Sequence, residues 1–441
     1  MIIACVVCKA THCFLRFFGK GATAMPGKAA LKIFPDLLRC LAENVNVIAV
    51  TGTNGKTTSV RMTETALENA GLRVFSNKSG ANLIEGITAE FVMNADVLGR
   101  PKCDWAVIEC DEAAARRVFG EIKPRVVLLT NLFKDQSDRY GDVKKPMEMI
   151  GEGLRKSPET VLAANADCQL TSAIAEKLNN KAVYFGLEGN KGRKPDASEE
   201  NRCASCGGKI LFRTVTYSNL GSWYCPDCGR KRQRPKVLVR DVADGRMLVD
   251  MGGEQRICGV ALPAVYNVYN AAGMIAAVTA AGIDAEAALA AAESFEGGFG
   301  RMEEFPLGKN GAEMILVKNT AAVNQTLDYI KALEGKKTVV FVQNANAGDG
   351  RDLSWLEDAD FEKLRRMRNI GRVIVAGDCG KEMQRRLSEA GVESELFAGY
   401  DKLIAELSRE ENRIFLLPSY TAMLQLRQKL VRKLGGKNFW E

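Results

Sequence analysis

Short apolar runs, mostly of β-branched residues, alternate with longer amphipathic stretches in two separate parts of the chain. In the first part, four runs have the length and composition of buried strands: 45–50, 105–109, 125–130 and 160–165. In the second part, four more runs follow Phe305: 315–319, 338–344, 373–377 and 414–419. Strands that alternate with helices predict a mostly parallel sheet covered by helices. The pattern therefore predicts two α/β domains, residues 1–302 and 303–441.

Residues 191–236 fit neither series, because they are polar, basic and rich in Gly, Pro and Cys. They include two Cys-x2-Cys pairs separated by eighteen residues: Cys203 with Cys206, and Cys225 with Cys228. This spacing is typical of a four-cysteine zinc site. Because four protein ligands would complete a tetrahedral coordination, we expect a structural zinc ion rather than disulfides. The stretch is predicted to be a zinc-ribbon insertion in the first domain.

Composition narrows the class of protein. The hydrophobic content of 46% is ordinary for a globular protein. A chain of 441 residues is too long to form one hydrophobic core. No segment reaches 18 consecutive apolar residues, so we expect a cytoplasmic protein without a membrane-spanning helix. The formal charge of +7 favours an anionic substrate or membrane surface without identifying either. We interpret the basic run 230–234 as a solvated face, with nucleic acid or anionic lipid as the alternative contacts, and we expect no nucleic-acid partner.

The histidine content limits the chemistry. His12 is the single histidine of the sequence, and it lies outside any motif. A Ser-His or Cys-His nucleophilic mechanism within this chain is therefore not expected. A hydrolytic half-reaction that needs histidine would have to come from a partner.

The strongest signal for chemistry is the segment TGTNGKTT at 51–58, which follows an apolar run and precedes a helical stretch. In such a loop, backbone N–H groups bind phosphates at the start of a helix. Lys56 would place a charge on the β- and γ-phosphates of ATP, and Thr57 would offer a hydroxyl to Mg²⁺. We expect the loop to be accessible to solvent, so that replacing Lys56 leaves the fold intact. Val50 stands where the strict pattern has glycine. The residues predicted to contact the nucleotide are Thr53, Asn54, Gly55, Lys56, Thr57 and Thr58.

Glu109 is the candidate second ligand of Mg²⁺. It ends the predicted strand 105–109, so its carboxylate would lie at the carboxyl edge of a parallel sheet, near the loop. A carboxylate there can hold the metal that bridges ATP phosphates. Asp111 and Glu112 fit a helix N-cap cluster better than Glu109 does.

Further segments resemble the successive ATP-site motifs of the Mur ligase family, in the same order. After TGTNGKTT they are TNLFKDQSDRYGD at 130–142, AANAD at 163–167, YNVYNAAG at 266–273 and GRMEEF at 300–305. Three C-terminal segments resemble the MurT subgroup: VKNTAAVNQ at 317–325, NANAGDGRDLSWL at 344–356 and LPSYTAMLQLR at 417–427. The resemblance implies a Mur ligase-type central P-loop ATPase domain, with the zinc-ribbon insertion, followed by a Rossmann-like α/β C-terminal domain.

The resemblance also implies further contacts with ATP. It places Asn131 and Asp135 near a second metal or the γ-phosphate, and it places Asn267, Asn270 and Arg301 on the nucleotide. An arginine can hold phosphates with its planar donor fork. Asparagines three residues apart share one face of a helix.

For activity, the resemblance implies transfer of the γ-phosphate of ATP to a carboxylate, followed by attack of a nitrogen nucleophile on the acyl phosphate. Lys56, Arg301 and the Mg²⁺ held by Thr57 and Glu109 would neutralise the transferred charge. In the MurT subgroup the nucleophile is ammonia, and the acceptor is the α-carboxylate of D-glutamate in the lipid II stem peptide. This lipid-linked substrate would bring the protein to the inner face of the membrane.

The ammonia would come from a GatD-type glutaminase partner, because this chain cannot form a Cys-His pair. The resemblance assigns a C-terminal aspartate to the partner's catalytic triad. Asp349 matches that position best, and Asp352 is the fallback.

Two other functions compete. An amino-acid-adding ligase of the same fold, such as a UDP-muramoyl peptide or folylpolyglutamate synthetase, is disfavoured by the short N-terminal region and by LPSYTAML at 417–424. A nucleotide-switched zinc-ribbon protein that binds nucleic acid should carry an N-K-x-D motif, and none is found. Thr320, Ala322 and Val323 depart from the MurT pattern, so the loop at 319–325 is expected to differ in shape.

Overall fold

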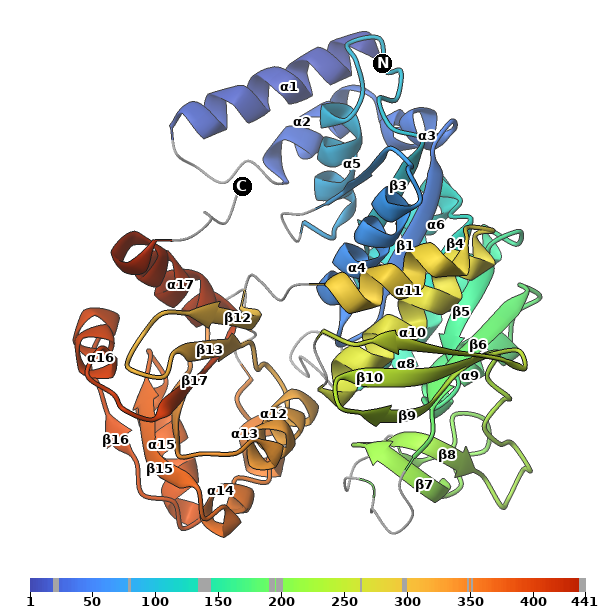
Figure 1. The fold of residues 1–441 in the computed structure, drawn as a ribbon. Coiled ribbons are helices and arrows are strands. Elements are labelled where there is room, and N and C mark those ends of the chain that lie inside the picture. The colour runs from blue at the N-terminus through green and yellow to red at the C-terminus, as the bar shows by residue number, and fades with distance from the viewer. Residues whose placement is uncertain are drawn as a thin grey trace. The chain divides into compact units, whose positions relative to one another are not determined.

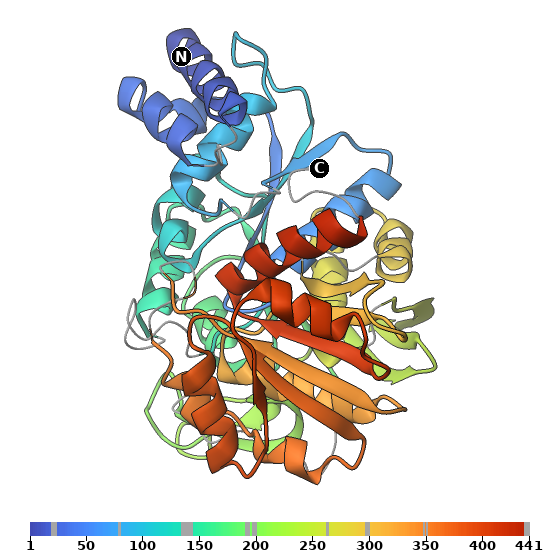
Figure 2. The same cartoon turned by 90° about the vertical axis from the view of Figure 1, so that its left-hand side faces the viewer.

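The computed structural model describes most of the chain in two compact units, shown in Figures 1 and 2. The first unit comprises Met1–Phe133 with Val143–Phe295, and the second comprises Lys134–Asp142 with Glu296–Glu441. The described residues are 1–18, 24–77, 81–133, 144–189, 195, 201–261, 264–295, 300–346, 349 and 352–435. The sequence predicted a division between 302 and 303. Arg301 and Met302 are instead the first two residues of β12 (Arg301–Phe305), the first strand of the second unit's sheet. They therefore belong with that sheet.

The first unit is built on a nine-stranded sheet in the order β11-β10-β9-β6-β5-β4-β1-β3-β2. Strands from β9 to β2 pair in parallel, and β9, β10 and β11 form an antiparallel meander. The strands are β1 (Asn46–Thr51), β2 (Val74–Ser76), β3 (Trp105–Glu109), β4 (Val126–Leu129), β5 (Val161–Asn165), β6 (Ala182–Leu187), β9 (Val237–Ala243), β10 (Arg246–Met251) and β11 (Glu254–Gly259). All four strands predicted in this part are confirmed, within one residue at each end.

Helices cover both faces of this sheet. They are α1 (Ile2–Phe17), α2 (Met25–Ile33), α3 (Leu37–Ala42), α4 (Lys56–Asn69), α5 (Ile84–Met93), α6 (Glu112–Ile122), α8 (Lys144–Arg155), α9 (Gln169–Glu176), α10 (Val265–Ala280) and α11 (Ala285–Ser294). The β1-α4-β2 connection runs in one direction along the sheet and β3-α6-β4 runs in the other. Right-handed crossovers therefore place α4 and α6 on opposite faces. Helix α4 packs with α10 and α11, whereas α6 packs with α8.

The change of direction puts the end of β1 at a topological switch point of the sheet. Here β1 lies between β3 and β4, and the chain leaves β1 on one face and β3 on the other. Ligands of open α/β sheets bind at such a point, beyond the carboxyl ends of the strands.

The predicted insertion forms a separate two-stranded antiparallel sheet, β7 (Leu211–Tyr217) with β8 (Leu220–Tyr224). Its small core contains Cys203, Ile210, Trp223 and Cys225. The Trp223 indole N–H donates to the Ala166 carbonyl at 2.9 Å. This hydrogen bond connects the insertion to the turn after β5.

The second unit is a six-stranded sheet in the order β12-β13-β17-β14-β15-β16, parallel except for the β12–β13 pair. The strands are β12 (Arg301–Phe305), β13 (Ala312–Ile315), β14 (Lys337–Val342), β15 (Ile370–Ala376), β16 (Glu395–Leu396) and β17 (Arg413–Pro418). The helices are α12 (Thr320–Ala332), α13 (Trp355–Asp358), α14 (Glu362–Arg366), α15 (Gly380–Glu389), α16 (Tyr400–Leu407) and α17 (Tyr420–Leu434). An α/β fold for the second part is confirmed.

Two details of the second part were wrong. The strand predicted at 315–319 lies earlier, because β13 ends at Ile315. The segment 319–325, predicted as a loop, begins α12, and the Asn319 side chain caps it by accepting from the Ala322 N–H at 2.9 Å. An N-cap at Asn319 requires the chain to leave the strand before that residue. Within the described ranges, no helix has the length and apolar character needed to cross a membrane.

Candidate active site

The segment 51–58 joins β1 to α4 as a tight loop in which two glycines have positive φ angles. Gly52 has φ 128° and Gly55 has φ 86°. A Cβ at Gly52 would lie 2.3 Å from Thr130 Oγ1, and a Cβ at Gly55 would lie 2.1 Å from Asn270 Oδ1. Glycine is therefore required at both positions by conformation and by close approach. Helix α4 begins at Lys56, and no side chain caps it. The backbone N–H groups of its first turn therefore lie at the end of the loop.

Lys56 lies inside a cage of oxygen atoms. Its ammonium donates to the Gly52 carbonyl at 2.5 Å and pairs with Glu112 Oε1 at 3.0 Å. The side chain is only 12% exposed, and the residues of the loop are buried or half-buried, so the loop is less accessible to solvent than expected. Burial opposes its charged form, but the carboxylates of Glu112, Glu109 and Asp111 outweigh burial and raise the pKa of Lys56 above its ordinary value. The lysine is therefore a fixed cation at the loop.

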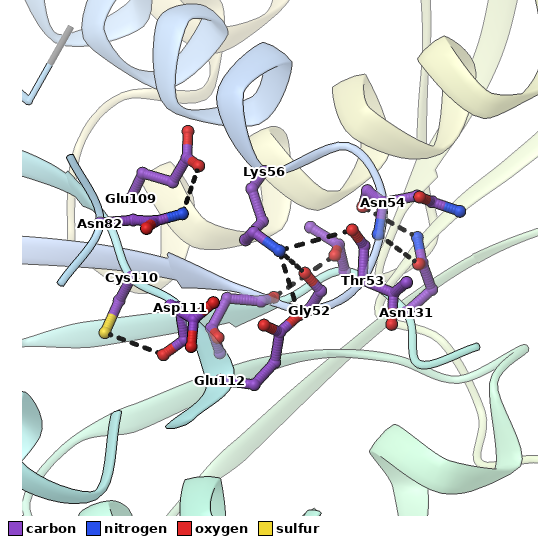
Figure 3. Close-up of polar contacts among 12 residues, drawn as sticks. Gly52, Thr53, Asn54, Lys56, Asn82, Glu109, Cys110, Asp111, Glu112 and Asn131 are labelled. Atoms are coloured by element: carbon purple, nitrogen blue, oxygen red, sulfur yellow. Dashed lines mark hydrogen bonds and ion pairs between the residues drawn. The ribbon is translucent and has the colours of Figure 1, made fainter. Parts of the chain in front are cut away.

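Glu109 and Thr57 meet at the same edge of the sheet, and Figure 3 shows the contact of Glu109 with Asn82. The Thr57 hydroxyl donates to Glu109 Oε2 at 2.5 Å, and the Asn82 amide donates to Oε1 at 3.1 Å. Asn77 holds the backbone of Glu109 through both its amide atoms, each at 2.8 Å. The Glu109 carboxylate is thus fixed beside the loop hydroxyl.

Asn131, predicted to lie near a metal or the γ-phosphate, uses its amide to shape the loop. Its Oδ1 accepts from the Asn54 N–H at 3.0 Å, and its Nδ2 donates to the Asn54 carbonyl at 3.1 Å. Its own carbonyl accepts from the Thr53 N–H at 2.8 Å. Figure 3 shows the paired contacts between Asn131 and Asn54. Asn131 therefore positions the loop backbone.

Helix α10 supplies the two predicted asparagines on one face. The Asn270 amide donates to Asn267 Oδ1 at 3.2 Å, and both side chains are buried. Ser59, in the first turn of α4, donates to Asn270 Oδ1 at 3.4 Å. Together with the close approach of Asn270 to Gly55, these contacts place this face of α10 against the loop.

The remaining predicted residues are Thr58, Arg301 and Asp135. Thr58 is buried in the first turn of α4, directly after the loop. Arg301 begins β12 in the second unit, and Asp135 lies outside the described residues. The contacts of Arg301 and Asp135 with a nucleotide stay predictions.

The four cysteines of the insertion converge. Their sulfur atoms all lie within 4.8 Å of one another, and this is the single cluster of potential metal ligands among the residues the structure describes. Burial opposes ionisation of Cys203, but N–H groups of Cys206 and Ser205 and the guanidinium of Arg230 lower its pKa to about 6. Tetrahedral zinc with Zn–S bonds of ~2.3 Å needs sulfur separations of about 3.8 Å. The observed Cys203–Cys228 and Cys206–Cys225 separations are 3.6 and 3.5 Å, so the site fits zinc.

The interpretation of the basic run 230–234 as a solvated face was wrong for Arg230 and Arg232. Arg230 pairs with Glu176 at 2.7 Å, and its guanidinium lies over the Trp223 ring. Arg232 pairs at 2.5 Å with Asp167, whose side chain is 0% exposed. The two arginines therefore hold the insertion onto the first unit instead of presenting charge to a partner.

Asp167 also binds α10. Its Oδ2 accepts from the Tyr269 hydroxyl at 2.6 Å and from the Leu187 N–H at 2.8 Å. Tyr269 precedes Asn270, the residue that approaches the loop. A buried polar network thus connects the insertion, through Arg232 and Asp167, to the helix beside the candidate ATP site.

Asp349, the residue predicted to serve a partner's triad, lies in the second unit at the N-terminus of α17. Its carboxylate accepts from the Thr421 N–H at 2.7 Å and from the Thr421 hydroxyl at 2.5 Å. It also accepts from the Asn346 N–H at 3.1 Å. A carboxylate is favourable at a helix N-terminus, so Asp349 has a structural role as the cap of α17. The fallback, Asp352, accepts from the Ser354 N–H at 2.8 Å.

Sequence reasoning missed three residues. Glu112 was interpreted as part of an N-cap cluster, but it is Asp111 that caps α6, through Ala113 N at 2.9 Å, while Glu112 pairs with Lys56. Asn77 and Asn82 were not identified at all. The position of all three after β2 and β3 was the available signal, since the carboxyl ends of these strands lie at the same edge of the sheet as that of β1.

Two protein-family models match the chain. Residues 50–278 match the model of the Mur ligase middle domain, and residues 316–423 match that of the MurT ligase C-terminal domain. The subunit MurT of the glutamine-hydrolysing lipid II isoglutaminyl synthase of Streptococcus pneumoniae is 32% identical over 437 residues, covering 96% of each chain. The corresponding subunit of Staphylococcus aureus is 32% identical over 430 residues, covering 96% of this chain and 95% of its own.

Solved structures support the fold. A pseudomurein peptide ligase type C from Methanothermus fervidus superposes with a TM-score of 0.66 at 20% identity, covering 88% of this chain and 79% of that one. MurF from Acinetobacter baumannii gives a TM-score of 0.67 at 15% identity, covering 92% and 80%. At these identities the likeness concerns the fold alone.

Proposed function

Because this chain belongs to the MurT branch of the Mur ligase family, we propose that it is the ATP-using synthetase subunit of a glutamine-hydrolysing lipid II isoglutaminyl synthase. The enzyme amidates the α-carboxylate of D-glutamate in the lipid II stem peptide to D-isoglutamine, a step of peptidoglycan synthesis. The observation that carries the ATP-dependent step is the convergence of Lys56, Thr57 and Glu109 on one loop at the switch point of the sheet.

The reaction has two chemical steps. A carboxylate oxygen of the substrate attacks the γ-phosphorus of ATP, and ADP leaves. Ammonia then attacks the carbonyl carbon of the acyl phosphate, loses a proton and expels phosphate. The protein's contribution is alignment and neutralisation of charge, since phosphoryl transfer needs little covalent help.

Lys56 and the loop backbone are the groups that hold phosphate. The ammonium of Lys56 has three donors, which contact the Gly52 and Thr53 carbonyls and Glu112, so exchanging a carbonyl for a phosphate oxygen would keep the ion pair with Glu112. The N–H groups at the start of α4 add a favourable dipole for anions. Arg301 of the second unit is proposed to contact the same phosphates.

Thr57 and Glu109 would hold Mg²⁺. A hydroxyl and a carboxylate oxygen 2.5 Å apart are hard oxygen donors, which suit this ion when phosphates and waters complete its coordination. When bound, Mg²⁺ would supply positive charge that neutralises the phosphates. Asn82 and Asn77 keep the Glu109 carboxylate in place for it.

A GatD-type glutaminase is the proposed partner. Ammonia is mostly protonated at neutral pH, and a glutaminase that releases it from glutamine needs a cysteine and a histidine. The single histidine, His12, lies on α1 of the first unit, away from the loop motif in sequence. Asp349 is proposed to orient the histidine of the partner, with Asp352 as the fallback. The lipid-linked substrate places the complex in the cytoplasm beside the membrane.

The first test is co-expression of this chain with a small glutaminase, followed by purification through a tag on the glutaminase. We expect the two to co-purify and to amidate lipid II with glutamine and ATP, releasing ADP and phosphate. The matched reaction replaces glutamine by single amino acids. Incorporation of an amino acid, with no amidation from glutamine or ammonium chloride, would support the amino-acid-adding ligase instead and overturn the proposal.

The four-cysteine cluster is proposed to hold a structural zinc ion. Replacing buried Cys203 or Cys225 with serine is expected to remove the metal, about one ion per chain, because binding energy at such a site is also folding energy. The fluorescence of Trp223, which packs against both cysteines, should change with the loss. Metal analysis and tryptophan emission measure the two effects.

Cys258→Ser is the matched control, since Cys258 is buried and lies outside the cluster. It should keep the metal and the emission spectrum. Anaerobically purified wild-type protein without zinc would rule the assignment out. Emission that changes in the same way in a Trp223→Phe background would assign the signal to another tryptophan.

A further inference from the structure

Helix α1 has two apolar faces, and only one of them is buried. Ala4, Cys5, Cys8 and Leu15 lie on the face that packs on α2 and α5. Figure 1 shows α1 at the outer edge of the first unit, with these two helices on one side of it. On the other face a row of apolar side chains recurs at helical spacing: Ile3, Val6, Phe14 and Phe17.

This second face is exposed to a degree that is unusual for large apolar residues. Exposure is 71% for Ile3, 48% for Val6, 63% for Phe14 and 85% for Phe17. A row of exposed apolar side chains on one helix marks a surface that contacts something else.

A neighbouring turn adds to the apolar surface. It lies beside the start of α1, because a Cβ at Gly99 would lie 3.0 Å from the Met1 sulfur. This turn exposes Val97 and Leu98. The exposed apolar surface therefore continues beyond α1.

The exposed charged side chains of α1 and α2 are basic, although Asp96 lies beside the neighbouring turn. Residues 1–35 contain no acidic residue and five basic ones: Lys9, Arg16, Lys20, Lys28 and Lys32. Five positive charges and no negative charge give this stretch a formal charge of +5, against +7 for all 441 residues. On α2, Met25, Lys28 and Lys32 follow one another at helical spacing and are exposed. Apolar and basic side chains thus share these two adjacent helices.

We propose that α1 and α2 dock on the surface of an anionic lipid bilayer. Amphipathic helices with Phe and aliphatic residues on one face and Lys or Arg beside it lie in the plane of the interface. The apolar side chains enter the boundary between headgroups and acyl chains, and the basic ones contact headgroup phosphates. Because no described helix can span a bilayer, the contact is peripheral.

Charge favours a bilayer over another copy of the chain. A second copy on this face would bring the exposed Arg16, Lys28 and Lys32 of one copy against those of the other, which disfavours association. An anionic bilayer satisfies both the apolar row and the positive charge. Under the proposed function, this surface is the one through which the protein reaches its lipid-linked substrate.

The test is co-sedimentation of the full chain with vesicles of phosphatidylcholine, with and without phosphatidylglycerol. Wild-type protein is expected to bind the anionic vesicles, to bind neutral ones less, and to be released by salt. The triple variant Ile3→Ser/Phe14→Ser/Phe17→Ser should lose affinity by about tenfold or more, because its apolar contact is gone. Lys28→Gln/Lys32→Gln should weaken binding to anionic vesicles alone.

Ile257→Ser, on β11, is the matched control, since Ile257 is 68% exposed but lies outside this surface. It should bind as wild type does. ATP turnover on a water-soluble substrate should be the same in the triple variant, which separates this proposal from the proposed reaction. Equal vesicle binding by the triple variant and wild type would overturn the docking surface. So would a triple variant whose binding is unchanged but whose oligomeric state or partner binding is lost, since that identifies a protein interface.

Discussion

Replacing Lys56 with alanine or methionine is expected to abolish ATP-dependent amidation, whether glutamine or ammonium chloride supplies the nitrogen. The ammonium is the fixed cation of the loop, and it is held 3.0 Å from Glu112 at 12% exposure. Removing such a preorganised charge from a phosphoryl-transfer site lowers kcat by about a hundredfold to a thousandfold or more. ADP release in single-turnover and steady-state assays measures this effect.

Loss of stability must be separated from loss of chemistry in this variant. Glu112 is 10% exposed, so without the lysine it is a buried carboxylate that has lost its counterion, which costs roughly 3–5 kcal/mol. The double variant Lys56→Met/Glu112→Gln removes both charges and should recover most of the thermal stability while staying inactive. Methionine preserves the length of the buried stem. Wild-type turnover in either variant would exclude the loop from phosphate binding.

Asp349→Asn is expected to separate the two half-reactions. If Asp349 orients a histidine of the glutaminase, the amide can no longer stabilise the imidazolium, and glutamine-driven amidation should fall by about a hundredfold or more. Ammonium chloride bypasses that step, so ammonia-driven amidation should survive. Parallel assays with the two nitrogen sources, on complexes shown to be intact by co-purification, measure the difference.

Because the Asp349 carboxylate also caps α17, control variants must separate this structural role from the role at the interface. Thr421→Val removes the hydroxyl that lies 2.5 Å from the Asp349 carboxylate but leaves the carboxylate itself, so glutamine-driven activity should persist. Asp352→Asn is the same substitution three residues away and should behave like wild type. If Asp352→Asn produces the split instead, the fallback is the interface residue. Loss of both activities in Asp349→Asn would assign that residue to the synthetase site and withdraw the interface role.

Local patterns in the sequence determined most of the fold. Continuous apolar runs, without alternation of polar and apolar residues, identified the central strands β1, β3, β4 and β5. Strands that helices cover on both faces are apolar throughout. The loop at 51–58 and the two Cys-x2-Cys pairs were also readable, since their chemistry depends on residues a few positions apart. The order of the remaining motifs placed the chain in its family.

Only the tertiary structure shows which charged residues that are distant in the sequence form ion pairs. Lys56 and Glu112 are 56 positions apart, and Arg232 and Asp167 are 65 apart, so neither pair is visible in any local pattern. For this reason an isolated basic run suggested a solvated face, although two of its arginines are paired with carboxylates of the first unit.

The same reason explains Asp349 and α1. Asp349 caps a helix 72 positions away, a contact that a Gly-rich turn in the sequence does not reveal. The periodicity of α1 shows two apolar faces, but only the packing of α2 and α5 determines which one is buried. The sequence therefore determined which residues are available for chemistry and packing. The folded chain decided which charged side chains are paired with an opposite charge, which side chains are buried and which face outward. The reason is that long-range contacts set the solvation of each side chain.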